Sequence, residues 1–142
     1  MALKFSDHKE IDVKQVLELY RNTDWAKDRT AEEARRVLSQ SSLVLSLWDG
    51  ERLVALARVL TDFIFRAAIY DVMVRPDAQR KGIGRLLIGR LLSHPSLNEV
   101  PVFHLLTKDK RLFYEKLGFL STDKRGLDAM IYVREIKVKT GG

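Results

Sequence analysis

The chain has 142 residues, 46% of them hydrophobic, and is therefore long enough to bury the core of one domain. It contains no cysteine, and its three histidines lie far apart in the sequence, so we expect no disulfide, no thiol nucleophile and no metal site. A formal net charge of +6 is typical of proteins that bind nucleic acid, an acidic membrane or an anionic ligand, although some of the basic residues can also be solvated surface charges.

The first half of the chain shows two helical patterns and then a hairpin pattern. Apolar residues at helical spacing predict a helix over residues 11–20, and Thr30 with Glu33 forms a capping box that predicts the start of a second helix. A polar loop over residues 22–25 separates the two helices. Two apolar runs, 43–48 and 53–60, flank an Asp-Gly pair and predict a β-hairpin with a tight turn.

The second half alternates strand and helix patterns. We expect strands over residues 69–74, 100–106 and 129–136, helices over 83–92 and 108–117, and a further strand beginning at Phe119. Gly89 interrupts the helix pattern, and close packing at that position would explain it. The order predicts an α/β fold, a single domain over residues 1–136 with a mixed central sheet flanked by helices, followed by a flexible tail over 137–142.

A basic glycine turn over residues 79–84 joins a strand pattern to a helix pattern. Backbone N–H groups and the positive end of the helix dipole point outward at such a turn, so it predicts a site for a phosphorylated ligand. The spacing does not match a Walker loop. It does not match a dinucleotide fingerprint either, because Leu87 stands where the third glycine would be.

Two motifs give a resemblance to a known family. Gln79, Gly82 and Gly84 fit the pattern Q/R-x-x-G-x-G/A, and residues 112–119 resemble a later F-Y-x-x-x-G-F segment that contains Tyr114. Both motifs resemble those of the GNAT superfamily of acyl-CoA N-acyltransferases, and the resemblance covers residues 42–133. It implies the GNAT fold and an N-acetyltransferase that moves the acetyl group of acetyl-CoA to a primary amine by direct attack of the amine on the thioester. The overall pattern is similar to that of members acting on small amines, which implies a small-molecule acceptor.

The resemblance also implies which residues contact the cofactor. The strand segment before the turn would bind the pantetheine arm through its backbone, the turn would bind the pyrophosphate, and Thr107 replaces an asparagine or aspartate that many members use for the pantetheine. These cofactor-binding residues are Val72, Met73, Val74, Gln79, Arg80, Lys81, Gly82, Ile83, Gly84 and Thr107.

Tyr114 and Asp71 are the candidate catalytic residues. Tyr114 matches the family tyrosine, and its phenol can donate a proton to the departing thiolate; the alternative is a core aromatic. Asp71 lies in an apolar strand, where it could act as a base or bind the substrate ammonium; the alternatives are that it accepts hydrogen bonds from a neighbouring loop or points to solvent. Asp24 and Trp25 lie in the loop that often lines the acceptor pocket in this family, although a lone loop tryptophan is also a common packing anchor.

Other acceptors and roles stay open. A protein lysine or N-terminus could be the acceptor, or the domain could bind acyl-CoA as a sensor without catalysis. We do not expect a nucleic-acid partner, because aromatic residues are not interleaved with the basic clusters. No segment is apolar enough for a membrane span or a secretory signal, so we expect a cytoplasmic protein without membrane contact. The family resemblance alone suggests a homodimer.

Overall fold

The computed structural model describes residues 2–134, and the expected tail at 137–142 lies outside them. The chain divides into two compact units, Met1–Leu106 and Thr107–Gly142. The first unit contains β1 (Leu3–Ser6), α1 (Val13–Arg21), α2 (Ala31–Gln40), β2 (Leu43–Asp49), β3 (Arg52–Thr61), β4 (Arg66–Val74), α3 (Ile83–Leu92) and β5 (Val102–His104). The second contains α4 (Arg111–Lys116) and a short 3-10 helix, Thr122–Arg125.

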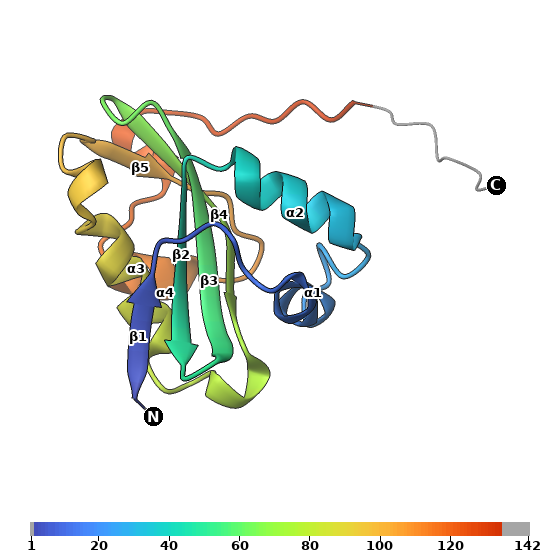
Figure 1. The fold of residues 1–142 in the computed structure, drawn as a ribbon. Helices are drawn as coiled ribbons and strands as arrows, with labels where there is room; N and C mark the ends of the chain where they lie inside the picture. Colours follow the sequence, from blue (N-terminus) through green and yellow to red (C-terminus); the bar gives the residue numbers. More distant parts are fainter. Residues whose placement is uncertain (1, 135–142) are drawn as a thin grey trace. The chain divides into compact units, whose positions relative to one another are not determined.

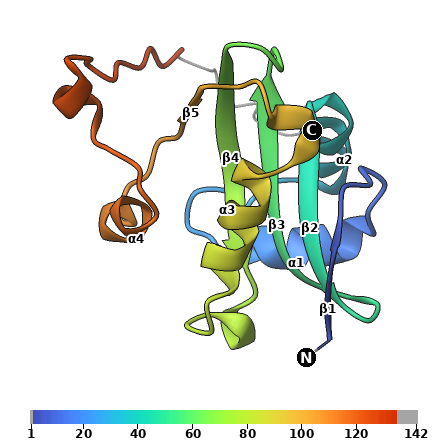
Figure 2. The same ribbon diagram turned by 90° about the vertical axis from the view of Figure 1, so that its left-hand side faces the viewer.

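The first unit is built on a mixed five-stranded sheet. Its strands follow in the order β1-β2-β3-β4-β5, with antiparallel pairs up to β4 and a parallel pair between β4 and β5. Helices α1 and α2 cover one face of the sheet, and α3 covers the other (Figures 1 and 2). This arrangement confirms the predicted fold class.

Apolar burial on both faces holds the helices to the sheet. On the α1–α2 face, the buried side chains of Val16, Tyr20 and Leu38 pack with Leu56 and Met73 of the sheet. On the other face, α3 buries Ile83, Leu87, Ile88 and Leu91. Each such side chain contributes about 1.5–3 kcal/mol when it leaves water.

Local signals set the boundaries of the N-terminal elements. The capping box predicted at α2 is present: Thr30 Oγ1 accepts the N–H of Glu33, and the Glu33 carboxylate accepts the N–H of Thr30. The predicted hairpin is also present as β2 and β3, and Gly50 at its turn has a φ of 60°, in the left-handed region that suits glycine.

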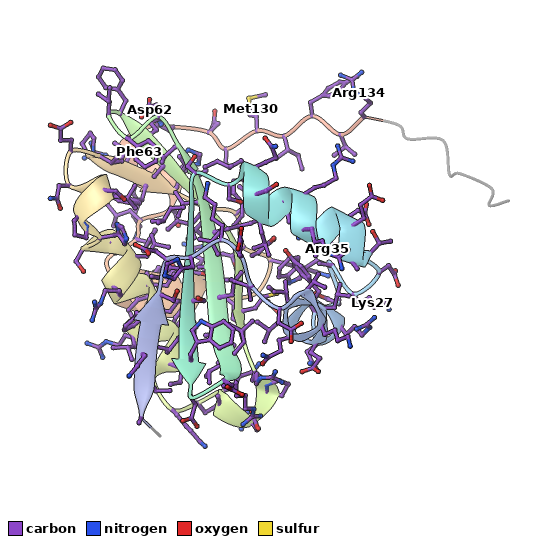
Figure 3. All side chains as sticks on the ribbon, viewed as in Figure 1. Lys27, Arg35, Asp62, Phe63, Met130 and Arg134 are labelled. Carbon is purple, nitrogen blue, oxygen red and sulfur yellow. The ribbon has the colours of Figure 1, made fainter. Side chains whose placement is uncertain are left out.

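The turn between β3 and β4 is held by one carboxylate. Asp62 Oδ1 accepts the backbone N–H groups of Ile64, Phe65 and Arg66, and Phe63 in between has a φ of 65°. Figure 3 shows Asp62 and Phe63 at this end of the hairpin. A single side chain thus accepts the backbone N–H groups of the turn, which have no partner strand where the chain reverses.

In the second unit, Gly118 closes the C-terminal end of α4, as the sequence predicts. Gly118 has a φ of 96°, its N–H donates to the Glu115 carbonyl, and the N–H of Phe119 donates to the Tyr114 carbonyl at 3.1 Å. These two bonds form a Schellman motif. The N–H of Phe119 is therefore used to close the helix, and the prediction of a strand beginning there is wrong.

Three further expectations from the sequence differ from the structure. Strand β1 is missing from the prediction, because four residues are too few to show a clear alternation. Residues 129–134 have no regular secondary structure, so the strand expected over 129–136 is absent in its described part. Finally, a Cβ at Gly89 would meet nothing within 4 Å, so close packing does not explain that glycine.

Candidate functional site

One edge of β4 is open over most of its length. Strand β5 pairs with β4 only at residues 66–68, and no other described residue pairs with that edge between Ile69 and Val74. On its other side β4 pairs with β3, and the register shifts between Leu56 and Arg58 show a bulge that places two residues of β4, Asp71 and Val72, opposite one of β3.

Backbone groups of Val74 point to this open edge. The N–H of Arg75 donates to the Val54 carbonyl of β3 at 2.8 Å. Because backbone groups alternate in direction along a strand, the N–H and C=O of Met73 then point to β3, and those of Val72 and Val74 point away from it. The Gln79 side chain donates to the freed Val74 carbonyl at 3.1 Å. Val72 and Val74 can therefore offer backbone hydrogen bonds to an extended ligand, whereas Met73 contributes to the core.

The glycine turn follows β4 after a short 3-10 helix, Pro76–Ala78, and leaves the first turn of α3 without a side-chain cap. Arg80 and Gly82 both have left-handed backbone, with φ values of 63° and 77°, and no side chain caps α3. The N–H groups of a first helical turn have no partner within the helix and attract anions. Arg80 and Lys81 are exposed beside them, whereas the side chain of Ile83 is buried, so only its backbone can bind a ligand.

Asp71 lies at the centre of a polar cluster on the α1–α2 face. Its Oδ2 accepts hydrogen bonds from Tyr20 Oη at 2.7 Å, from Arg29 Nη1 at 2.6 Å and from Arg58 Nε at 2.6 Å. The Asp71 side chain is only 4% exposed. The backbone of Asp71 has a φ of 52°, a left-handed value that aspartate tolerates better than most residues.

The cluster sets the charge state of its members. Burial alone would raise the pKa of Asp71, but hydrogen bonds from Arg58, Tyr20 and Arg29 and the charge of Arg58 together hold that pKa below its usual value. Burial and the negative charge of Asp71 raise the pKa of Tyr20 to about 12. At neutral pH the cluster thus contains one carboxylate, two guanidinium groups and a neutral phenol.

The loop between α1 and α2 brings Trp25 to the same cluster. The guanidinium carbon of Arg29 lies 4.7 Å from the centre of the Tyr20 ring and 5.7 Å from that of Trp25. Trp25 is 53% exposed, so it is not a buried packing anchor. Asp24 is also exposed on this loop.

In the second unit, Tyr114 is buried and packs edge-on against two phenylalanines. The ring centres of Phe113 and Phe119 lie 5.0 Å and 5.5 Å from that of Tyr114. Burial raises the pKa of Tyr114 to about 12, and its hydroxyl donates to no other described residue. Thr107 is exposed, and its Oγ1 accepts the N–H of Lys110 just before α4.

Three members of the polar cluster, Tyr20, Arg29 and Arg58, were not among the site residues predicted from the sequence. A signal for Arg58 was present: a lone arginine in the apolar run 53–60 and a lone aspartate in the next apolar run suggest an ion pair across neighbouring strands. Within residues 2–134, we find no group of three or more potential metal ligands and no helix with the length and hydropathy of a membrane span.

Comparison with known proteins agrees with this geometry. A family model described as an acetyltransferase (GNAT) domain matches residues 7–138, a range that includes parts of both units. An uncharacterized N-acetyltransferase from Pyropia yezoensis is 31% identical over 132 residues, which cover 89% of this chain and 75% of that protein. The GCN5-related N-acetyltransferase 3, chloroplastic, of Arabidopsis thaliana is 30% identical over 101 residues, 70% of this chain and 42% of that protein.

A solved structure gives the same result. A protein from Xanthomonas campestris pv. campestris, described as belonging to the GNAT family, superimposes with a TM-score of 0.79 at 27% identity, covering 93% of this chain and 94% of that one. The open edge of β4, the uncapped start of α3 and the family match together identify the protein as a member of the GNAT family of acetyl-CoA-dependent acetyltransferases.

Proposed function

We propose that this enzyme transfers the acetyl group of acetyl-CoA to the primary amine of a small molecule. The observation that carries the proposal is the open edge of β4, which is followed, after the 3-10 helix Pro76–Ala78, by the glycine turn. An extended pantetheine arm fits a free strand edge, and a pyrophosphate fits the uncapped helix start that follows it. Bound acetyl-CoA would supply an activated thioester at this edge.

The residues of the strand would bind and orient the reacting groups. Because Val72 directs its backbone N–H to the open edge, it is positioned to donate to the thioester carbonyl oxygen as negative charge develops there. In the reaction the amine nitrogen forms a bond to the acetyl carbon, the C–S bond breaks, and the sulfur leaves as a thiolate that takes up a proton.

Tyr114 is the proposed source of that proton. Its raised pKa keeps the phenol protonated over the whole range in which the enzyme would work, and its hydroxyl has no acceptor among the described residues. A free, protonated donor is what a departing thiolate requires.

The amine must lose its proton before it attacks, at a cost of about 4–5 kcal/mol at pH 7 for a lysine-like amine. Asp71 is a poor base for this step, because its lowered pKa means that it holds a proton weakly. We propose that Asp71 acts instead by holding Arg29 and Arg58 in place, and that Asp24 and Trp25 line the entry for the acceptor.

The test is calorimetric binding of acetyl-CoA, followed in the same sample by release of free thiol with a panel of small amines. Binding with thiol release on a small amine supports the proposal. Binding with release only on protein lysines or N-termini would assign the alternative acceptor, and binding with no release would favour a sensor. The cytoplasmic location and the homodimer remain predictions.

A further inference from the structure

The polar cluster around Asp71 has more positive than negative charge. Two guanidinium groups, those of Arg29 and Arg58, share a single carboxylate oxygen. Of these side chains, Arg58 is 12% exposed and Arg29 is 28% exposed, so water screens their mutual repulsion only in part. The cluster thus has one uncompensated positive charge in a largely buried position.

Most of the hydrogen-bond donors in this cluster are unused. A guanidinium has five N–H donors, but Arg29 donates only through Nη1 and Arg58 only through Nε among the described residues. No buried side-chain nitrogen in the described part of the chain lacks a partner, so the remaining nitrogens of both arginines must reach solvent. Free donors of both side chains are therefore accessible to a ligand.

Aromatic rings hold both guanidinium groups in fixed orientations. Arg29 lies over Tyr20 and near Trp25, and the guanidinium carbon of Arg58 lies 5.0 Å from the centre of the Tyr70 ring. Because the side chains are already ordered by these contacts and by Asp71, a ligand that binds them pays little further conformational entropy.

The position of the cluster connects it to the reaction. Asp71 directly precedes Val72, whose backbone faces the open edge where the thioester would lie. Tyr20 and Arg29 reach Asp71 from α1 and from the loop after it, so the cluster is on the α1–α2 face, beside the loop that carries Trp25.

We propose that Arg29 and Arg58 recognise an anionic group, carboxylate or phosphate, on the amine acceptor itself. This inference rests on the proposed function, since it specifies the class of amine that the enzyme acetylates. Planar guanidinium groups match the oxygen atoms of these anions, and the charge-assisted hydrogen bonds that result are the stronger kind. The same positive charge repels a second ammonium group, so polyamines are poor acceptors.

The test compares acceptors that differ by the anionic group. Phenylalanine is paired with phenethylamine, and phosphoethanolamine with ethanolamine, and kcat/KM is measured for each from thiol release with acetyl-CoA. The first pair tests a carboxylate and the second a phosphate. The amine of an amino acid is less basic than that of its decarboxylated partner, so the two members of a pair differ in reactivity as well as in charge. The informative quantity is therefore the ratio of kcat/KM for the anionic acceptor to kcat/KM for the neutral one, compared between the wild type and each variant.

Arg29→Gln and Arg58→Gln are each expected to lower this ratio of anionic to neutral kcat/KM by about tenfold or more for at least one pair. The main cause should be a higher KM for the anionic acceptor. Arg35→Gln is the matched control. Arg35 is exposed on α2 (Figure 3) and makes no hydrogen bond or ion pair with the described members of the cluster, so this variant loses the same charge without removing a cluster contact. Unchanged ratios in both cluster variants, or an equal change in the control, would overturn the inference.

Two further measurements cover a variant that does not fold and an enzyme that releases no thiol. Arg29 is the more exposed of the two arginines, so Arg29→Gln remains informative if Arg58→Gln does not fold. If no amine releases thiol, the proposed function fails, and the CoA-bound protein is titrated with the same four ligands by calorimetry. Tighter binding of the anionic member of a pair, lost in Arg29→Gln, would still support the anion site, and no preference would reject it.

Discussion

Arg58 and Asp71 lie on neighbouring strands and are joined by a hydrogen bond of 2.6 Å from Nε to Oδ2, just at the bulge of β4. The pair is largely buried, and Asp71 also accepts from Tyr20 and Arg29. A single carboxylate thereby connects β3, β4, α1 and the loop after α1. Its removal should affect stability and not only catalysis.

Asp71→Asn is expected to lower the free energy of unfolding by about 3 kcal/mol, because it leaves two partly buried guanidinium groups without their counter-charge. Asparagine keeps the shape of the side chain and tolerates the positive φ, so the loss would report the charge. Urea denaturation measures it. Asp77→Asn is the matched control, since Asp77 pairs with Arg52 on the exposed surface and its loss should be much smaller. Equal losses in both variants would contradict the burial argument.

The same carboxylate predicts how stability depends on pH. In the unfolded chain Asp71 titrates near its ordinary value of about 3.9, and in the folded protein its pKa is lower. The folded state therefore binds this proton less readily, so the stabilisation is complete above about pH 5 and is lost as the pH falls through the folded pKa. Urea denaturation midpoints are measured from about pH 7 down to about pH 3. As the pH falls, the midpoint should decrease less steeply for Asp71→Asn than for the wild type. Parallel curves would show that Asp71 does not carry the dependence.

Gly82 tests the glycine turn. A Cβ at this position would meet no atom within 4 Å, but φ is 77°, so Gly82→Ala should destabilise the fold by about 1 kcal/mol through backbone strain alone. Gly82→Asn tolerates that conformation and should stay near wild-type stability, yet its side chain would occupy the space of the pyrophosphate. We expect calorimetry to show at least about a tenfold loss of acetyl-CoA affinity for Gly82→Asn.

Gly89→Ala provides the control for these variants. Gly89 lies inside α3 with ordinary helical backbone and open space around it, so alanine should stabilise the helix by up to about 1 kcal/mol and leave acetyl-CoA affinity unchanged. Unaltered affinity in Gly82→Asn would remove the turn from the cofactor site.

The sequence predicts those features that depend on local rules. The capping box at Thr30, the left-handed Gly118 and the full extent of α3 follow from residue spacing and from backbone preferences within a few positions. The Asp71 cluster depends on contacts between residues up to 51 positions apart, and no local pattern encodes them. Only the isolated charges of Arg58 and Asp71 in apolar runs hinted at a pair.

The strand expected over residues 129–136 shows the opposite case. Its apolar residues satisfy the strand pattern, but a strand forms only when a neighbour supplies hydrogen bonds, and the described part has none of these. Side chains from Met130 to Val133 are strongly exposed as a result. Composition predicts a tendency, and pairing decides whether it is realised.

Tyr114→Phe removes the proposed proton donor and changes little else. The ring contacts with Phe113 and Phe119 would be kept, so we expect folding and acetyl-CoA affinity to stay as in the wild type, while kcat falls by about 10²-fold. Tyr132→Phe makes the same change at a residue of the second unit that is 86% exposed, and its kcat should not fall.

The acidity of the leaving thiol separates catalysis by Tyr114 from a packing role. The raised pKa, about 12, keeps the phenol protonated, so the wild type should show no loss of kcat from this group until the pH approaches that value. An acyl donor with a more acidic leaving thiol needs less help from a proton donor, so acyl-CoA analogues of this kind should narrow the difference in kcat between Tyr114→Phe and the wild type. If kcat of Tyr114→Phe equals that of the wild type with every donor, Tyr114 serves only to pack α4.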